Sequence, residues 1–98
     1  MSERHIRSLG YIKALNDYHV HMNAGRDKLA KASLRPFGAR LESTYTKLVQ
    51  FVILESLTPD EIEMLLDTPL ISKTVRLPCG HVIQYNVSRD EVEKFYTV

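Results

Sequence analysis

The spacing of apolar residues changes once along this chain, and that change restricts the class of fold it can form. Over residues 3–67 apolar side chains recur every three or four positions, which places them on one face of a helix. Over residues 73–87 apolar and polar residues alternate instead, which is typical of strands with one buried face. The sequence therefore predicts an α+β fold, mainly helical, with the element order α-α-α-β-β-α in one small domain of residues 1–98.

A helical hairpin is predicted for the first half of the chain. Its arms are residues 3–34 and 38–57, joined near Pro36, which disfavours helical geometry in the residue before it. The first arm has two interpretations: Gly25 ends one helix and Asp27 caps a second, or the apolar pattern continues as a single helix. The second arm is the most apolar segment and is predicted to be the centre of the core. The core-facing residues expected in the first arm begin with Ile6, Leu9, Ile12, Leu15, His19 and Met22.

Two capping boxes mark the starts of the remaining helices. Thr58 with Glu61 predicts a short helix over residues 59–67, and Ser88 with Glu91 predicts a final helix near the C-terminus. The residues expected to face inward are Ile62, Leu65 and Leu66 in the short helix, and Val92, Phe95 and Tyr96 in the final one.

The alternating segment, residues 73–87, predicts a β-hairpin. Apolar residues occupy odd-numbered positions in both halves, as at Val75 and Ile83. For both sets to share one face, odd-numbered residues must pair with odd-numbered ones, which requires a loop of three or five residues. The tip of the hairpin should therefore lie at residues 79–81.

Recognisable catalytic or metal-binding motifs do not occur in this sequence. The segment from Leu77 to Ile83 resembles the Cys-Gly-His segment of RING-type zinc domains, but such a site needs four ligands and Cys79 is the only cysteine. His19 and His21 are two positions apart on a helix and point away from each other, so they cannot hold one metal together. The sequence predicts no enzymatic activity, no metal and no cofactor.

The single cysteine also bears on location. No internal disulfide can form, which favours the reducing cytoplasm, and the charged start of the chain does not resemble a secretory signal. The longest apolar run, residues 51–54, is too short to span a membrane, so no membrane association is expected.

Charge is distributed unevenly along the chain. Residues 1–50 contain nine Lys or Arg and four Asp or Glu, whereas residues 51–98 contain four and eight. The two halves are expected either to attract each other or to be solvated separately. The densest basic stretch, residues 26–40, is an expected contact for an anionic partner.

The predicted function is recognition. A small domain without catalytic motifs is expected to be a protein-binding regulator or adaptor, or an inhibitor of a larger enzyme, by analogy of size with small regulators such as those of phages. A two-stranded hairpin has open edges, so a larger protein or a second copy could dock on it or on the basic stretch. The alternative is a nucleic-acid-binding protein that uses residues 26–40. The predicted partner-binding residues are Arg76, Gln84, Lys28, Lys31 and Arg35.

Overall fold

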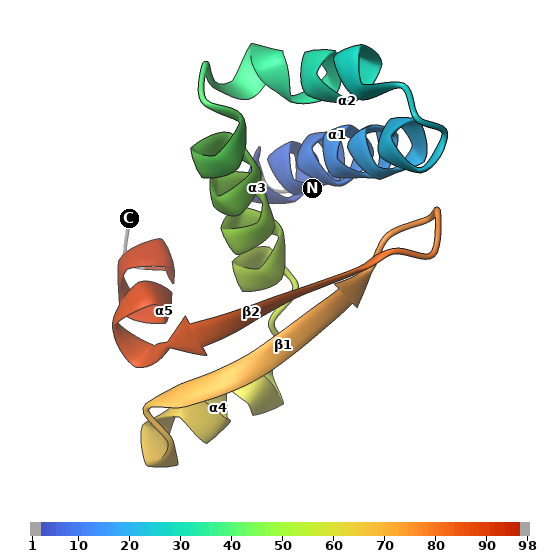
Figure 1. Cartoon of the computed structure of the whole chain (residues 1–98). Coiled ribbons are helices and arrows are strands. Elements are labelled where there is room, and N and C mark those ends of the chain that lie inside the picture. Colours follow the sequence, from blue (N-terminus) through green and yellow to red (C-terminus); the bar gives the residue numbers. More distant parts are fainter. Residues whose placement is uncertain (1–2, 97–98) are drawn as a thin grey trace.

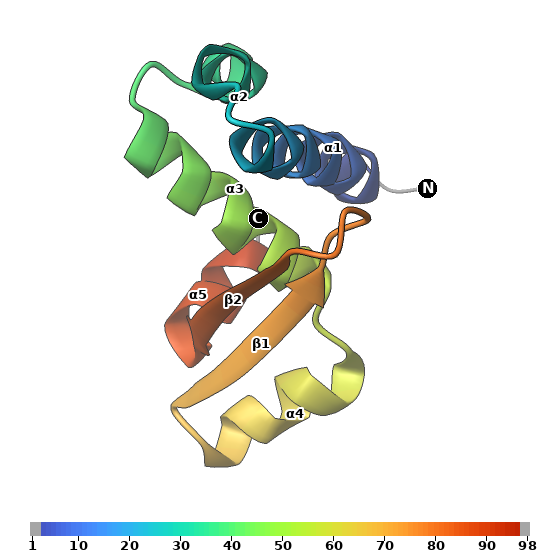
Figure 2. The ribbon, with the colours of Figure 1, turned by 45° about the vertical axis from the view of Figure 1, so that its right-hand side comes forward.

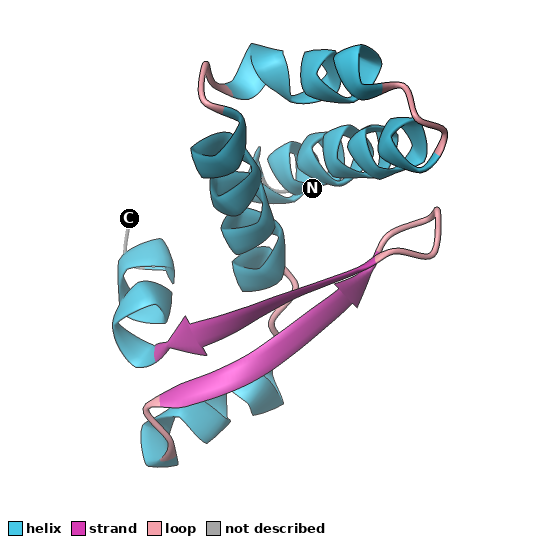
Figure 3. Cartoon of the chain, viewed as in Figure 1, coloured by secondary structure: helices cyan, strands magenta, loops and turns pink. Residues whose placement is uncertain are grey.

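The computed structural model describes residues 3–96, which form five α-helices and one two-stranded sheet (Figures 1 and 3). The mainly helical α+β class is confirmed, with helices first, then two strands, then a last helix. No helix among the described residues is both long enough and apolar enough to cross a membrane. The elements are α1 (Glu3–Asn23), α2 (Asp27–Leu34), a 3-10 turn η1 (Arg35–Phe37), α3 (Leu41–Glu55), α4 (Pro59–Asp67), β1 (Leu70–Arg76), β2 (Val82–Ser88) and α5 (Arg89–Tyr96).

The first arm of the predicted hairpin consists of two helices. Gly25 has a φ of +75°, a left-handed conformation that glycine adopts without a Cβ clash, and the chain reverses there. As a result α2 packs back along α1, and the single-helix interpretation is wrong (Figure 1). Asp27 is not the cap: Arg26 holds that position without a side-chain capping bond, and Asp27 begins the helix.

The buried face of α1 differs from the predicted one. Leu15 is fully buried and Ile12 packs against the core, as expected, but Ile6 and Leu9 are 59% and 48% exposed, and Met22 is exposed as well. The packed face instead follows Ser8, Tyr11, Leu15 and Tyr18, whose spacing is also helical. Tyrosines therefore supply part of the seam that the aliphatic residues were expected to form.

Helix α3 is the centre of the core, as predicted. It packs against α1 on one side and against both strands on the other (Figure 2). Its buried residues are Thr44, Leu48, Val49, Val52, Ile53 and Leu54.

The short helix α4 begins with the predicted capping box, in which Glu61 N–H donates to Thr58 Oγ1 and Thr58 N–H donates to Glu61 Oε1. Leu65 is buried and Ile62 half-buried, as expected, but Leu66 is 70% exposed. The prediction for Leu66 is wrong because α4 packs mainly against β1 and α5, and its fully buried residue is the neighbouring Leu65.

The hairpin has the predicted parity. Val75 pairs with Ile83, and odd-numbered residues face odd-numbered residues along the ladder. Leu77 N–H donates to the His81 carbonyl at 2.8 Å, and Gly80 N–H donates to the Leu77 carbonyl at 2.9 Å. Gly80 has a φ of +97°, which a tight loop of this kind requires. The odd-numbered face covers the helices, and the even-numbered face is exposed.

The molecule is elongated, measuring 43 × 25 × 24 Å. Basic α2 and acidic α4 lie at its two ends in both views (Figures 1 and 2). These two charged segments, both described in full, therefore do not form ion pairs with each other.

Candidate functional site

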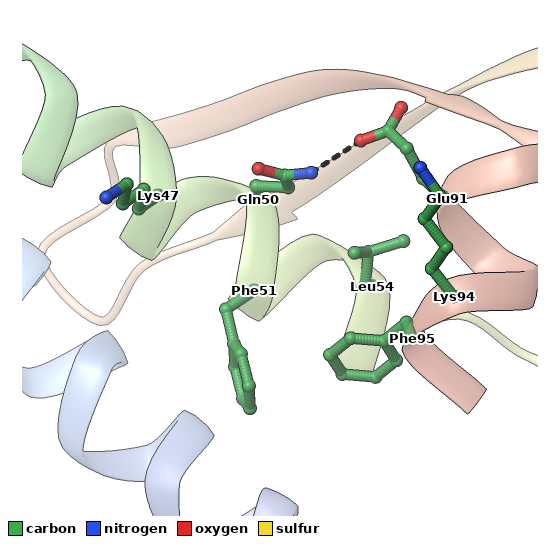
Figure 4. A pocket seen from close by; sticks show the side chains of 7 residues that line it. All are labelled: Lys47, Gln50, Phe51, Leu54, Glu91, Lys94 and Phe95. Atoms are coloured by element: carbon green, nitrogen blue, oxygen red, sulfur yellow. Dashed lines mark hydrogen bonds between the residues drawn. The ribbon is translucent and has the colours of Figure 1, made fainter. Parts of the chain in front are cut away.

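A groove with a volume of about 450 Å³ lies between α3 and α5 (Figure 4). Its apolar lining comes from Phe51 and Leu54 on α3 and from Phe95 on α5. The rings of Phe51 and Phe95 meet edge to face, with centroids 5.2 Å apart. Aromatic and aliphatic walls of this kind suit a bulky apolar side chain.

Two local features place α5 against α3 and so create the groove. The Ser88–Glu91 capping box starts α5 directly after β2: Glu91 N–H donates to Ser88 Oγ at 3.2 Å, and Ser88 N–H donates to Glu91 Oε1 at 3.2 Å. At the other end of α5, Tyr96 is 41% exposed rather than facing inward as predicted, but its Oη reaches α3, where it donates to the Leu54 carbonyl at 2.8 Å. The helix is held at both ends, so the distance between the groove walls is fixed.

Lys47 and Lys94 lie at the rim of this groove, on opposite helices (Figure 4). Both are exposed, and neither forms an ion pair with another residue of the part that the structure describes. The groove thus combines an apolar floor with two lysines that have no ion-pair partner within residues 3–96. Such a combination fits an apolar group that carries a carboxylate beside it.

Glu91 also lines the groove, but its carboxylate already has several partners. Its Oε2 accepts hydrogen bonds from Gln50 Nε2 and Tyr85 Oη, each at 2.6 Å. Burial tends to raise the pKa of Glu91, but the hydrogen bonds from Tyr85, Ser88 and Gln50 outweigh burial and lower it. The same bond to Glu91, with burial, raises the pKa of Tyr85 to about 12. Glu91 is therefore a structural anion; within residues 3–96 it forms no ion pair with Lys47 or Lys94, and its negative charge lies in the groove beside theirs.

Three of the predicted partner-binding residues lie together on α2 and η1. Lys28, Lys31 and Arg35 are three and four positions apart, which places them on one helix face, and all three are exposed. None of them forms an ion pair within residues 3–96. We call these three residues the basic face; it occupies one end of the molecule (Figure 1).

The other two predicted residues, Arg76 and Gln84, lie on the exposed face of the sheet, as their even numbers imply. Gln84 Nε2 donates to Ser72 Oγ across the strands at 2.7 Å. Helix α1 lies between α2 and the hairpin, so the structure does not join Arg76 and Gln84 to the basic face (Figure 1).

A second cluster, which the sequence did not predict, forms where the hairpin loop meets α1. His81 stacks on His19 with ring centroids 3.6 Å apart and an interplanar angle of 19°. His19 is half-buried, as predicted, and its Nε2 lies 2.8 Å from Tyr45 Oη. Within residues 3–96, no three His, Cys, Asp or Glu side chains are grouped so that they could hold a metal ion.

Comparison with models of protein families, with curated proteins and with solved structures found no match to this chain. The candidate sites are therefore interpreted from their own geometry. One feature of the sequence could have indicated the groove. Phe51 and Leu54 make the apolar face of α3 wider than one neighbouring helix can cover.

Proposed function

We propose that this protein is a small, non-catalytic binding module of the cytoplasm, a regulator or adaptor that docks on a larger protein. The observation that supports this proposal is the α3–α5 groove, with its aromatic walls and its two unpaired lysines. Inhibition of an enzyme partner is one form that such docking takes. The lone free cysteine, Cys79, agrees with a reducing compartment.

The chemistry of the groove defines the kind of segment it would receive. A bulky apolar side chain of the partner packs onto the lining that Phe51, Leu54 and Phe95 form together, where burial of apolar surface supplies most of the binding energy. Acidic residues beside that side chain pair with Lys47 and Lys94, which add specificity and speed association. The partner is therefore a protein with an exposed acidic segment that contains a large apolar residue.

Reversing both rim charges, Lys47→Glu with Lys94→Glu, is expected to weaken partner binding by about tenfold or more, because attraction becomes repulsion around an intact apolar floor. Partners are captured from native lysate, identified by mass spectrometry, and the recovered partner is titrated against each variant. The matched control is Lys28→Glu with Lys31→Glu, the same charge change on the basic face.

An unchanged affinity in the groove variant would show that the groove is not the docking site. Loss in the control variant alone would place docking on the basic face instead. Arg76→Glu with Gln84→Ala, measured in the same assay and by gel filtration, tests the exposed sheet face and self-association in the same way.

Nucleic-acid binding is the second candidate function, and the basic face favours it. Lys28, Lys31 and Arg35 offer three exposed positive charges without carboxylate partners. If these residues contact about three phosphates, the logarithm of affinity should fall with the logarithm of salt concentration at a slope near −3. Retention on a nucleic-acid column measures this slope, and the variant with Lys28→Glu and Lys31→Glu should lose that retention.

A further inference from the structure

The loop at the hairpin tip, residues 77–81, is attached to α1 by two contacts. Cys79 N–H donates to Asn16 Oδ1 at 2.7 Å, and the imidazole of His81 lies flat against that of His19. The loop comes close to α1 at that helix's C-terminal half, where Asn16 and His19 lie (Figure 1). Both contacts join segments that are distant in sequence, so they determine how the hairpin tip sits on the helical layer.

The stacked geometry depends on the charge of the two rings. Neutral imidazoles can stack face to face at 3.6 Å without electrostatic cost. Histidine is the side chain whose charge changes most readily between pH 5 and pH 8. Two imidazolium cations at this distance repel each other, and the exposure of His81 to water reduces this repulsion without removing it.

Few groups around the stack could stabilise a second positive charge on it. Tyr45 Oη, at 2.8 Å from His19 Nε2, is a neutral hydroxyl, and burial raises its pKa further. Of the two carboxylates nearby, Asp17 is paired with Lys13 at 3.3 Å, and Glu42 is exposed and makes no hydrogen bond to His19. The titratable and charged groups around the stack are Asp17 and Tyr18 from α1, Glu42 and Tyr45 from α3, and Cys79 from the loop.

The neighbouring helix α2 adds no opposing charge. Its buried residues are Ala30 and Leu34, and its charged residues are exposed. Burial, and then the charge of His81, lower the pKa of His19, which agrees with a site that disfavours the protonated ring.

We propose that His19 and His81 form a pH-sensitive latch, which holds residues 78–81 on α1 when both rings are neutral and releases them when both are protonated. The release is confined to the tip, because Leu77 is buried and the pairing of Val75 with Ile83 continues to hold the strands. Opening exposes the side of α1 around Asn16 and His19. The protein would thereby present a different surface below about pH 6 than above pH 7.

Amide hydrogen exchange, followed by NMR on the full chain, tests the latch. The protection of the Cys79 amide, corrected for the intrinsic exchange rate, should fall about tenfold between pH 8 and pH 5 as the loop is released. In His81→Phe, which keeps a flat ring but cannot be protonated, this protection should stay constant. The matched control, His21→Gln, removes a histidine outside the stack and should retain the pH dependence of the native protein.

Constant Cys79 protection in the native protein would overturn the latch, and so would an equal loss of protection in His81→Phe. The Ile83 amide, within the strand pair, serves as the internal reference for a folded hairpin. Where His81→Phe fails to fold, His81→Gln provides the same comparison, since its side chain is neutral at both pH values.

Discussion

Replacing Val52 with aspartate is expected to unfold the protein. Val52 is 1% exposed and lies on α3, next to the fully buried Ile53. A carboxylate at this position would be enclosed by apolar side chains with no partner for its charge, at a cost on the order of 4 kcal/mol or more. A domain of this size has a total stability of about 5–15 kcal/mol, so little or none would remain. Far-UV circular dichroism and urea unfolding measure the loss.

The matched control is Val20→Asp, the same substitution at a position on α1 that is 39% exposed. Its effect on the free energy of unfolding should stay within about 1 kcal/mol, because the carboxylate remains in water. A Val52→Asp variant with a cooperative transition near that of the native protein would show that α3 is not the centre of the core.

The β-hairpin could be predicted almost completely because its determinants are local. The parity of the apolar residues required the pairing that Val75 and Ile83 adopt, and Gly80 supplied the left-handed residue of the loop. The capping boxes at Thr58 and Ser88 were local in the same sense, and both are formed.

The buried face of α1 was harder to predict. The spacing of apolar residues identifies stripes along a helix, but it does not show which stripe a neighbouring helix covers. Helix α1 carries an aliphatic stripe that includes Ile6 and Leu9, and a second stripe that includes Tyr11 and Tyr18. The reversal at Gly25 places α2 on α1, and with α3 it covers the second stripe rather than the first. The choice between the stripes was therefore made by tertiary packing.

The groove and the histidine stack could not be predicted from the sequence, for a related reason. Phe51 and Phe95, like His19 and His81, come from segments far apart along the chain, and nothing local relates their positions. The basic face could have been predicted from the sequence. Once α2 is known to be a separate helix, the spacing of Lys28, Lys31 and Arg35 places them on one side of it.

Replacing Glu91 with alanine is expected to lower the free energy of unfolding by about 2–3 kcal/mol, the largest effect of any polar substitution proposed here. The carboxylate accepts hydrogen bonds from Tyr85, Gln50 and both the N–H and the Oγ of Ser88, so it joins β2, α3 and the start of α5. Alanine would remove the Glu91 side-chain half of the capping box and leave the half-buried donors of Tyr85 and Gln50 unpaired. Asp90→Ala, an exposed carboxylate in the same helical turn, is the control and should cost about 0.5 kcal/mol.

The effect of Glu91→Ala should also depend on pH, in a direction that the pKa of Glu91 determines. Burial raises this pKa, but the hydrogen bonds from Tyr85, Ser88 and Gln50 outweigh burial and lower it below the unfolded-state value. The unfolded chain therefore binds the proton more readily, so the stabilisation is complete above about pH 5 and is lost as the pH falls towards the folded-state pKa. Urea unfolding at pH 7 and pH 4 should give a smaller difference between the native protein and Glu91→Ala at pH 4 than at pH 7. A difference that stays constant would mean that alanine destabilises the fold through lost packing, and that the charge of Glu91 does not hold the junction together.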